Sequence, residues 1–596
     1  AKASTAYAAA LAYFHQANRL LPVASWKSNY AFTLSLKSNT VEAAYLNHAL
    51  ASVASLIEEV LNTARTLLDK IKLYEIQIQA AIGDNQLIEA VDQGFAVLEQ
   101  LGVTLLDPEA VSITLPPVDE LDTVPDMGDP AKVAALRILV SMFSAIYNGK
   151  PELLKPTIWT MVHLCTTAGH TAVSPVAYSV YGMSRCGSGD IETGYQSGRI
   201  ALKLTEGALG QSTGGQAMRA KVLEQLGGFI SHWKEHVSNS IEQFEQGLHS
   251  GLEVGDIEYA CHSAKNACAH LVLLGTPLEQ VQQKQLHYIE LGQQLNQQHI
   301  LTYAKIWRQL ALNLLGQSGA PWLLVGESFD EQAMLPSLRK KNNYFSLYVI
   351  YFSKQMLCYL FGQLAQAVEN TRILETYSEA SLGSLMSVVQ NFYTSLIFLA
   401  EYLNKQRETL PQENPSRESL PEQIALNQEK MKRGADYAPM NHLHKYLLVE
   451  AEKHYALGTY MVAIDLYDRA IATAKENNYV QEEALANELA AKFWLNWGKN
   501  KVAAGYLQEA YYGYARWGAK AKTDALERDY PQLLEPILQT TAQPISFVET
   551  LTEIDHSWES HQRTDSSAME SAASSIDIHS SNSNIQIGRA SCRERV

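Results

Sequence analysis

The chain has 596 residues, of which 46% are hydrophobic and 18% are charged, and its formal net charge is −16. A chain of this length does not fit into one compact core, so we expect several domains or an array of repeats. The composition argues against disorder of the whole chain. The acidic balance argues against nucleic acid or an anionic membrane as the main partner, because phosphate binding requires a basic surface.

Residues 1–106 are predicted to form helical repeats with a truncated start. Ala10, Phe14 and Ala17 lie at helical spacing and match the second half of a repeat. The chain starts with neither Met nor a signal-peptide pattern, so we expect the natural N-terminus to lie upstream. No stretch reaches the roughly 20 apolar residues that span a bilayer. The six scattered cysteines fit a reducing compartment. We therefore expect a cytoplasmic protein without membrane insertion.

The middle of the chain alternates between helical and irregular patterns. Residues 107–130 hold five prolines and seven acidic residues without a Lys or Arg, which predicts an exposed acidic loop. Residues 131–404 return to helical repeats, in which spaced glycines such as Gly182 and Gly194 serve turns and close packing. Residues 405–440 are polar and helix-prone, which predicts a linker or a surface helix. We expect almost no β-structure.

The clearest repeats lie in residues 441–534. The stretch AEKHYALGTYMVAIDLYDRAIATA predicts a helix, a turn at Gly458 and a second helix with one packing stripe, formed by Ala463, Tyr467, Ala470 and Ala474. The same skeleton recurs between Ala491 and Ala510. This pattern resembles the tetratricopeptide repeat (TPR). We therefore predict an all-α fold, a right-handed TPR-like helical-repeat solenoid, closed by a capping helix within residues 516–530.

The last residues change in composition twice. Residues 535–586 are rich in Ser and Asn and poor in large apolar residues, so we predict a disordered linker. Residues 587–596, IGRASCRERV, are basic and resemble a translated sequencing adapter; the alternative is a genuine basic tail. If the tail is an adapter, the natural reading frame departs at or next to Gln586 and the chain is a fragment.

No catalytic constellation is visible in the sequence. It contains no phosphate-binding P-loop, no kinase signature and no G-x-S-x-G elbow, so we predict no catalytic, cofactor-binding or metal site in this segment. The string from His232 through Glu235 to His236 matches the H-x-x-E-H pattern, in which two histidines on one helix face bind zinc and the glutamate acts as a base. We prefer ordinary histidines of a repeat helix, because no third ligand can be assigned.

Two further pairs of candidate ligands are better explained by structure. His442 and His444 point to different sides if their segment is helical, which makes them a poor ligand pair. Cys261 and Cys268 share one helix face and are predicted to lie in the core, since free Cys behaves as a small hydrophobe.

A solenoid also presents polar residues of its inner helices on a concave face, where partners bind. The candidates here are Glu452, Tyr455, Lys492 and Asn496. They depart from the matched Lys, Asn and Arg set with which tetratricopeptide domains clamp a peptide C-terminus. We therefore predict a plain solvated face at these residues.

Residues 441–534 also resemble a more specific family, on the motifs Gln481-Glu-Glu-Ala-Leu, Ala490-Ala-Lys-Phe and Arg516-Trp-Gly-Ala. They are similar to the region before the GAF domain in very large bacterial, often cyanobacterial, signalling proteins. These proteins join a serine/threonine kinase, an ATPase of the AAA/STAND kind, helical repeats, a GAF sensor and a histidine kinase. The resemblance implies a non-catalytic connector between an upstream kinase/ATPase module and a downstream GAF–histidine kinase phosphorelay. It also implies that only the missing parent domains bind ATP and Mg, and that these domains and other signalling proteins are the partners.

Other interpretations remain open at this point. One is the helical sensor region of an ATPase-linked (STAND) transcription activator that ends in a helix-turn-helix. Another is a free TPR scaffold, and a metallopeptidase survives only through the H-x-x-E-H string. The sequence that follows Gln586 discriminates between a GAF–histidine kinase and a helix-turn-helix.

Overall fold

The computed structural model describes residues 7–47, 50–84, 86–295, 297–381, 383–408 and 422–542. The chain divides into two units, Ala1–Leu534 and Glu535–Val596. The described part of the chain is helical and contains no strand; its β-interactions are two isolated bridges, between Asp126 and His170 and between Val325 and Asp330. The all-α prediction is confirmed.

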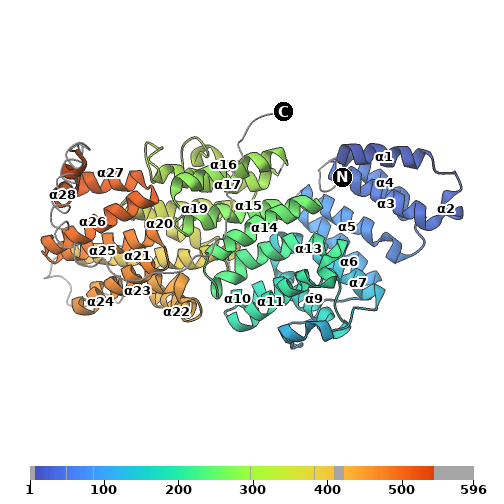
Figure 1. Cartoon of the computed structure of the whole chain (residues 1–596), viewed down its shortest axis with the longest axis horizontal. Coiled ribbons are helices and arrows are strands. Elements are labelled where there is room, and N and C mark those ends of the chain that lie inside the picture. The colour runs from blue at the N-terminus through green and yellow to red at the C-terminus, as the bar shows by residue number, and fades with distance from the viewer. Residues whose placement is uncertain are drawn as a thin grey trace, which may run out of the picture. The chain divides into compact units, whose positions relative to one another are not determined.

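The first group of helices runs from the N-terminal end through the acidic 107–130 segment to residue 153 (blue in Figure 1). It comprises α1 (Tyr7–Arg19), α2 (Ser25–Ser28), α3 (Tyr30–Leu46), α4 (Leu50–Thr63), α5 (Leu67–Gly83), α6 (Leu87–Gln100), the 3-10 helix η2 (Val118–Thr123), α7 (Pro130–Ser141), α8 (Phe143–Gly149) and the 3-10 helix η3 (Pro151–Leu153).

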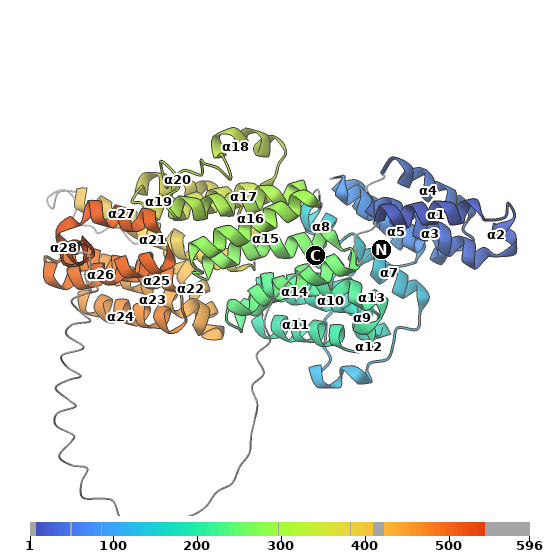
Figure 2. The same ribbon diagram turned by 45° about the horizontal axis from the view of Figure 1, so that its top comes forward.

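The second group forms the middle of the first unit (Figures 1 and 2). It comprises α9 (Leu154–Ala168), α10 (Ser174–Gly187), α11 (Ile191–Glu206), α12 (Ala208–Gln211), α13 (Thr213–Gln225), the π-helical turn η4 (Leu226–Ile230), η5 (Ser231–Trp233), α14 (Ser238–Val254), α15 (Ile257–Leu273), α16 (Leu278–Gln294), α17 (Gln298–Leu314), α18 (Glu331–Lys340), α19 (Tyr344–Leu360), α20 (Leu364–Glu375) and η6 (Ser378–Ser381).

The third group follows in the sequence, and its helices up to Asp529, within the first unit, lie at the end opposite to α1–α4 in Figure 1. It comprises α21 (Leu385–Glu408), α22 (Glu422–Tyr437), α23 (Pro439–Ala456), α24 (Tyr460–Glu476), α25 (Val480–Asn496), α26 (Asn500–Trp517), α27 (Lys520–Asp529) and α28 (Pro531–Ala542).

A recurring pair of residues explains how one helix ends and the next begins. Gly189 and Gly255 have φ angles of 93° and 80°, in the left-handed region that glycine adopts most easily, and each stops a helix. The following aspartates, Asp190 and Asp256, accept a hydrogen bond from the third backbone amide of the next helix and so cap it. The two residues together turn the chain into an antiparallel helix pair.

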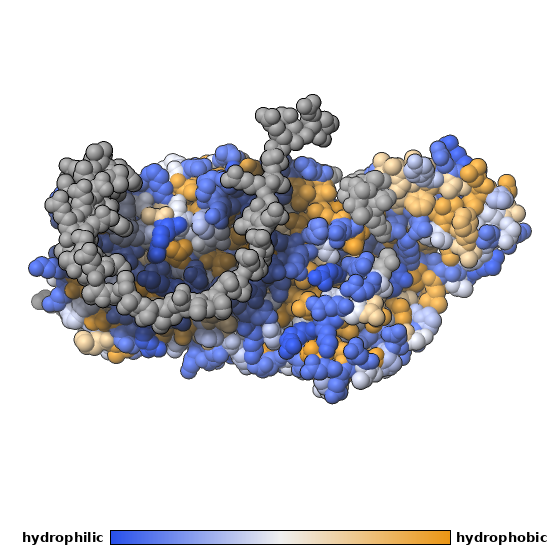
Figure 3. Space-filling view, in the orientation of Figure 1, coloured by the Kyte–Doolittle hydropathy of each residue, from blue (hydrophilic) through white to orange (hydrophobic). Residues whose placement is uncertain are grey.

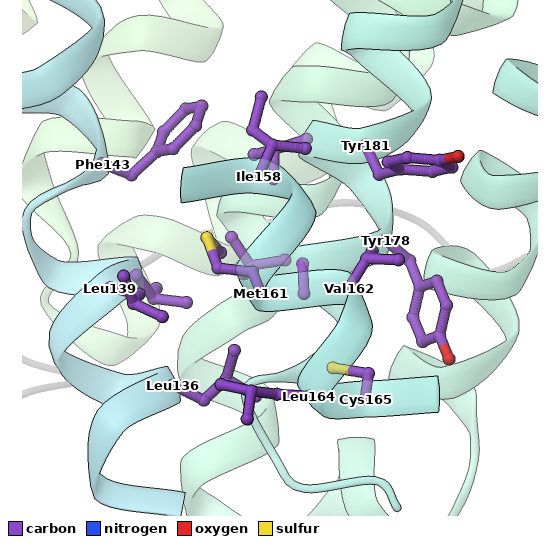
Figure 4. Packing of buried hydrophobic residues seen from close by; sticks show 14 of the residues in the cluster. Leu136, Leu139, Phe143, Ile158, Met161, Val162, Leu164, Cys165, Tyr178 and Tyr181 are labelled. Atoms are coloured by element: carbon purple, nitrogen blue, oxygen red, sulfur yellow. The ribbon is translucent and has the colours of Figure 1, made fainter. Parts of the chain in front are cut away.

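Two apolar cores lie within the first part of the described residues, between Leu11 and Ile230. The larger core extends from α5 to η4, and Figure 4 shows α7, α9 and α10 meeting in it through Leu139, Met161, Val162 and Tyr178. A smaller core joins α1, α3, α4 and α5 through residues such as Val41. Apolar side chains also remain on the surface over α1–α4 (Figure 3), which include Tyr13, Leu20, Val23 and Phe32. Each core is built mainly by helices that are close in the sequence.

The stripes predicted for the C-terminal repeats are confirmed. Ala463, Tyr467, Ala470 and Ala474 of α24 are all buried, and so are Ala503, Leu507 and Ala510 of α26. Gly458 has a φ angle of 78° directly after α23. The glycine packing is also confirmed, because a Cβ on Gly182 would lie 2.7 Å from the carbonyl oxygen of Gly194. The assignment of the whole array to a right-handed TPR-like solenoid stays a prediction.

Two predicted segments need correction. The 107–130 segment is not wholly exposed, because η2 forms within it and Leu121 and Met127 reach the large core. The 405–440 segment, for which a linker or a surface helix was expected, contains α22; one face of this helix is exposed and the other, which includes Met431, is buried. Residues 535–542, predicted as the start of the disordered linker, belong to α28, because the apolar residues after Pro531 continue a helical pattern. The rest of that linker and the tail predicted as an adapter lie outside the described residues.

Within the described ranges, no single helix is long and apolar enough to cross a membrane. Only α7 and α8 taken together, with a bend of 43° between them, reach the required length and composition.

Candidate functional site

The chain leaves the regular helical path between α13 and α14. Leu226–Ile230 form a π-helical turn, and Ser231–Trp233 form a 3-10 turn that is followed by the irregular residues 234–237. Residues 231–237 together are here called the connecting segment. Gly227 and Gly228 favour the break because glycine is a poor helix former. Turns of the π type are frequent at functional sites.

Asn441 of α23 fastens the connecting segment to the C-terminal helices. Its Nδ2 donates to the carbonyl oxygens of His232 (2.8 Å) and Glu235 (2.6 Å). Its Oδ1 accepts from the backbone amide of Val237 (3.1 Å) and from the hydroxyl of Tyr479 (2.9 Å). Asn441 is fully buried. All four hydrogen-bonding positions of this amide are therefore used, and we call this set of contacts the Asn441 joint.

A buried charged cluster lies beside the joint. The ammonium of Lys445 is 2.8 Å from Glu482 Oε2 and 2.9 Å from the Asn441 carbonyl oxygen, and His444 contacts the same carboxylate. Burial alone would raise the pKa of Glu482, but the neighbouring Lys445 and His444 lower it below its usual value. Burial lowers the pKa of Lys445 despite this partner. The ion pair links α23 to α25, and removal of one partner would leave the other charge buried and unpaired.

Three buried histidines beside the joint, His232, His442 and His444, are held in their neutral form. Burial lowers the pKa of His442 to about 3 and that of His444 to about 4, with the Lys445 charge adding to both effects. Burial also lowers the pKa of His232 well below its usual value. The two ring nitrogens of His232 have no hydrogen-bond partner among the described residues. These imidazoles therefore act as neutral packing groups at pH 7.

The inner helices of the C-terminal repeats also cap helices from the middle of the chain. Gln481 of α25 donates to the carbonyl oxygen of Leu273, at the end of α15 (2.7 Å). Lys522 of α27 donates to the carbonyl oxygen of Leu360, at the end of α19 (2.7 Å), while it is paired with Glu488 (2.9 Å). Last-turn carbonyls lack partners inside their own helix, so a donor from elsewhere stabilises them.

These contacts share one property. Seven side-chain hydrogen bonds between described residues join positions 150 or more apart in the sequence. Each of the seven involves the connecting segment or one of the inner helices α23, α25 and α27. Two of these bonds have not been described above. Trp233 Nε1 donates to the Gly383 carbonyl oxygen (3.3 Å), and His236 Nε2 contacts the Asn477 carbonyl oxygen (3.1 Å). These long-range polar contacts are thus concentrated on the connecting segment and on the inner C-terminal helices.

The residues predicted to form a solvated concave face lie in different environments. Glu452 is buried and accepts a hydrogen bond from Tyr467, and burial raises its pKa to about 7. Tyr455 is bound by Arg407 (3.0 Å), Lys492 pairs with Glu488 (2.8 Å), and Asn496 is exposed. The prediction is wrong for Glu452, because helices from earlier in the chain pack against this side of the C-terminal repeats.

The H-x-x-E-H string does not lie on a regular helix, contrary to the geometry on which its zinc interpretation depended. His232 is buried beside Trp233 and His442, Glu235 accepts from Tyr195 (2.7 Å), and His236 contacts Ser238 and the Asn477 carbonyl oxygen. Within the part of the chain that the structure describes, no group of three or more His, Cys, Asp or Glu side chains could hold a metal ion.

The other two predictions about paired residues are confirmed. His442 faces His232, with ring centroids 6.2 Å apart, whereas His444 faces Glu482 on another side of α23. Cys261 and Cys268 are free and buried.

The sequence analysis missed Asn441, Lys445 and Lys522. A signal for such a site was present in α25, which carries polar residues from Gln481 to Glu488 among alanines that pack on both sides. A helix that carries small apolar residues on two opposite faces is buried on all sides. Its polar residues must therefore have hydrogen-bond partners inside the protein.

Comparisons with known proteins reveal a weak similarity to a signalling protein. No family model matches the chain. Over 161 residues, 27% of the chain, the sequence is 29% identical to the hybrid signal transduction histidine kinase G of Dictyostelium discoideum. The chain covers 5% of the length of that relative. This weak, partial similarity indicates a signalling-related region.

Proposed function

We propose that this chain is a non-catalytic helical connector of a multidomain signalling kinase. In this proposal it couples an upstream kinase/ATPase module to a downstream GAF–histidine kinase phosphorelay, and its helices belong to a TPR-like solenoid. ATP and Mg bind to the parent's other domains. The similarity to a hybrid histidine kinase over a small part of that protein's length supports this assignment.

The observation that carries the proposal is the concentration of long-range polar contacts at the Asn441 joint and the two helix caps. A connector transmits a signal when two arrangements of packed elements differ in free energy by a few kcal/mol. Asn441, Gln481 and Lys522 each fasten segments that are distant in the sequence. Such single polar contacts can be exchanged without dismantling the apolar cores.

The test begins with the gene. The reading frame across Gln586 should continue into GAF and histidine kinase sequence. The full encoded protein should then be purified with Asn441→Ala or with the control Asn487→Ala, and its autophosphorylation by labelled ATP measured. Asn487 is also buried, but it donates only within its own helix, to the Glu483 carbonyl oxygen (2.9 Å).

We expect Asn441→Ala to change the autophosphorylation rate severalfold and Asn487→Ala to leave it near the wild-type value. A helix-turn-helix in place of the kinase would favour the STAND transcription activator. A stop codon shortly after Val596 in genomic DNA would favour a free scaffold. Equal rates in all three proteins would contradict coupling through the joint.

A further inference from the structure

Four buried or half-buried lysines of the described residues are held by carboxylates. Nitrogen–oxygen distances of 2.7 to 2.9 Å join Lys221 to Asp256, Lys354 to Glu331, Lys445 to Glu482 and Lys522 to Glu488. Such pairing offsets the loss of hydration. The ammonium of Lys265, on α15, has neither an ion pair nor a hydrogen bond within the described ranges.

Aromatic rings take the place of a counter-ion at Lys265. Its Nζ lies 4.5 Å from the ring centroid of Phe345 and 5.5 Å from that of Tyr303. The two rings are stacked, with centroids 5.2 Å apart and planes inclined by 5°. Together they form a flat apolar surface, here called the Lys265 shelf, contributed by α17 and α19. Lys265 as a whole residue is half-buried.

Charged groups on the neighbouring helices do not neutralise this amine. Glu224 of α13 acts on it electrostatically, but this carboxyl is buried, accepts from Asn266 (2.8 Å), and has a pKa raised by burial. Lys221 and His262 also lower the pKa of Glu224 electrostatically. Lys265 therefore bears an incompletely compensated charge.

The amine is consequently easier to deprotonate than an exposed one. Burial lowers the pKa of Lys265 to about 8, although Glu224 opposes this effect. At pH 7 about a tenth of these amines are neutral, against about one in 2,500 for an exposed lysine with a pKa of about 10.4. The neutral amine is the nucleophilic form.

We propose that Lys265 is a site of Nε-acylation by a small acyl phosphate. The product suits the site better than the free amine does. An amide is neutral and planar, so it needs no carboxylate partner and can lie flat on the Lys265 shelf. An imine formed with an aldehyde would carry a charge when protonated and would restore the same unpaired cation.

The reaction needs no component other than the acyl donor. The neutral Nζ attacks the carbonyl carbon, and a C–N bond forms. The bond between that carbon and the phosphate oxygen breaks, and phosphate leaves with the electron pair. The proton on nitrogen passes to water. The modification removes the cation–π contacts that join α15 to α17 and α19. This inference does not depend on the proposed signalling function.

The experiment uses the complete chain and acetyl phosphate. The protein is incubated at pH 6.5 to 9.5, digested, and the acetylation rate of each lysine is followed by mass spectrometry. Lys221 is the matched control, because its ammonium lies 3.8 Å from the ring centroid of Tyr259 but is also paired with Asp256. At pH 7.5 we expect Lys265 to react at least about tenfold faster than Lys221, with a half-maximal rate near pH 8.

One variant separates this chemistry from simple exposure. Glu224→Gln removes the negative charge that stabilises the ammonium, so the midpoint should fall and the rate at pH 7 should rise. If Glu224→Gln lacks the helical circular dichroism spectrum, the wild-type pH profile decides. Equal rates at Lys265 and Lys221, or a Lys265 rate that still rises steeply at pH 9.5, would overturn the proposal.

Discussion

Replacement of Asn441 by alanine should weaken the link between the connecting segment and the C-terminal helices more than any neighbouring polar substitution. The change removes two donors that serve the carbonyl oxygens of His232 and Glu235, and one acceptor that serves the Val237 amide and the Tyr479 hydroxyl. All of these groups lie in a region that is mostly shielded from water.

The expected cost follows from the number of groups left without partners. A buried polar group that loses its hydrogen bond costs about 1 to 3 kcal/mol, and entry of water reduces this cost. Four such groups at the low end give a loss of about 4 kcal/mol, which is roughly a thousandfold in an equilibrium constant. The control Asn487→Ala loses a single bond within α25 and should cost about 1 kcal/mol.

Native-state hydrogen exchange measures this effect locally, which matters because a chain of this size need not unfold in one step. The Val237 amide should exchange about 100- to 1,000-fold faster in Asn441→Ala than in the wild type. The same amide should be unchanged in Asn487→Ala. Amides of α9 and α10, inside the large core, serve as an internal reference in both variants.

Asn441→Asp tests the bonding scheme itself. Aspartate keeps an acceptor for Val237 and Tyr479 but directs a second oxygen at the two carbonyl oxygens that Asn441 now binds. It should therefore destabilise the joint at least as much as alanine does. Protection of Val237 that stays at the wild-type level in both variants would refute the joint.

Three further outcomes are expected. Gly182→Ala should destabilise the α10–α11 pair by about 1 to 3 kcal/mol, because its Cβ would meet a backbone oxygen at 2.7 Å, whereas Gly505→Ala, with open space around the new methyl group, should stabilise α26 by about 0.5 to 1 kcal/mol in urea unfolding. Lys445→Met should cost several kcal/mol, since the buried carboxylate of its partner is left unpaired; an unchanged melting temperature would contradict the pairing. Burial lowers the pKa of His270 and of His442 to about 3. The contribution of each residue to the free energy of unfolding is complete above the unfolded pKa of about 6.5. As the pH falls from 6.5 towards 3, each contribution decreases by about 1.4 kcal/mol per pH unit. In His442→Gln, the free energy of unfolding in urea should fall less steeply between pH 6.5 and 4 than in the wild type, because the contribution of His442 is gone. An identical pH dependence in the two proteins would refute the assignment.

Much of the helical framework could be predicted from the sequence, because its causes are local. The stripe that includes Ala463 and Tyr467, and the turn at Gly458, depend on helical periodicity and on the conformational freedom of glycine. The burial of Cys261 and Cys268 follows from their shared helix face. These features need no knowledge of what lies across from them.

The candidate site could not be predicted because its partners are far apart in the sequence. Asn441 is one polar residue among many until the connecting segment is placed against it. Glu452 is a plausible solvated residue until helices from earlier in the chain cover it. The zinc interpretation of His232 and His236 assumed a continuous helix, and Gly227 and Gly228 lie where that helix breaks. Pairing across about 200 positions leaves no periodic trace in the sequence.

The distribution of contacts bears on how a signal could pass through this chain. Apolar packing between consecutive helices gives stability that accumulates along the chain and changes little when one distant contact is lost. The joint is different, because Asn441, Gln481 and Lys522 each satisfy a backbone group that belongs to a segment far away. Any event that moves α23, α25 or α27 must therefore either carry the connecting segment and the ends of α15 and α19 along or leave buried polar groups without partners, at about 1 to 3 kcal/mol each. A penalty of that size is comparable to the coupling free energies of known allosteric systems. A few hydrogen bonds are therefore enough to link the middle of the helical array to its C-terminal helices.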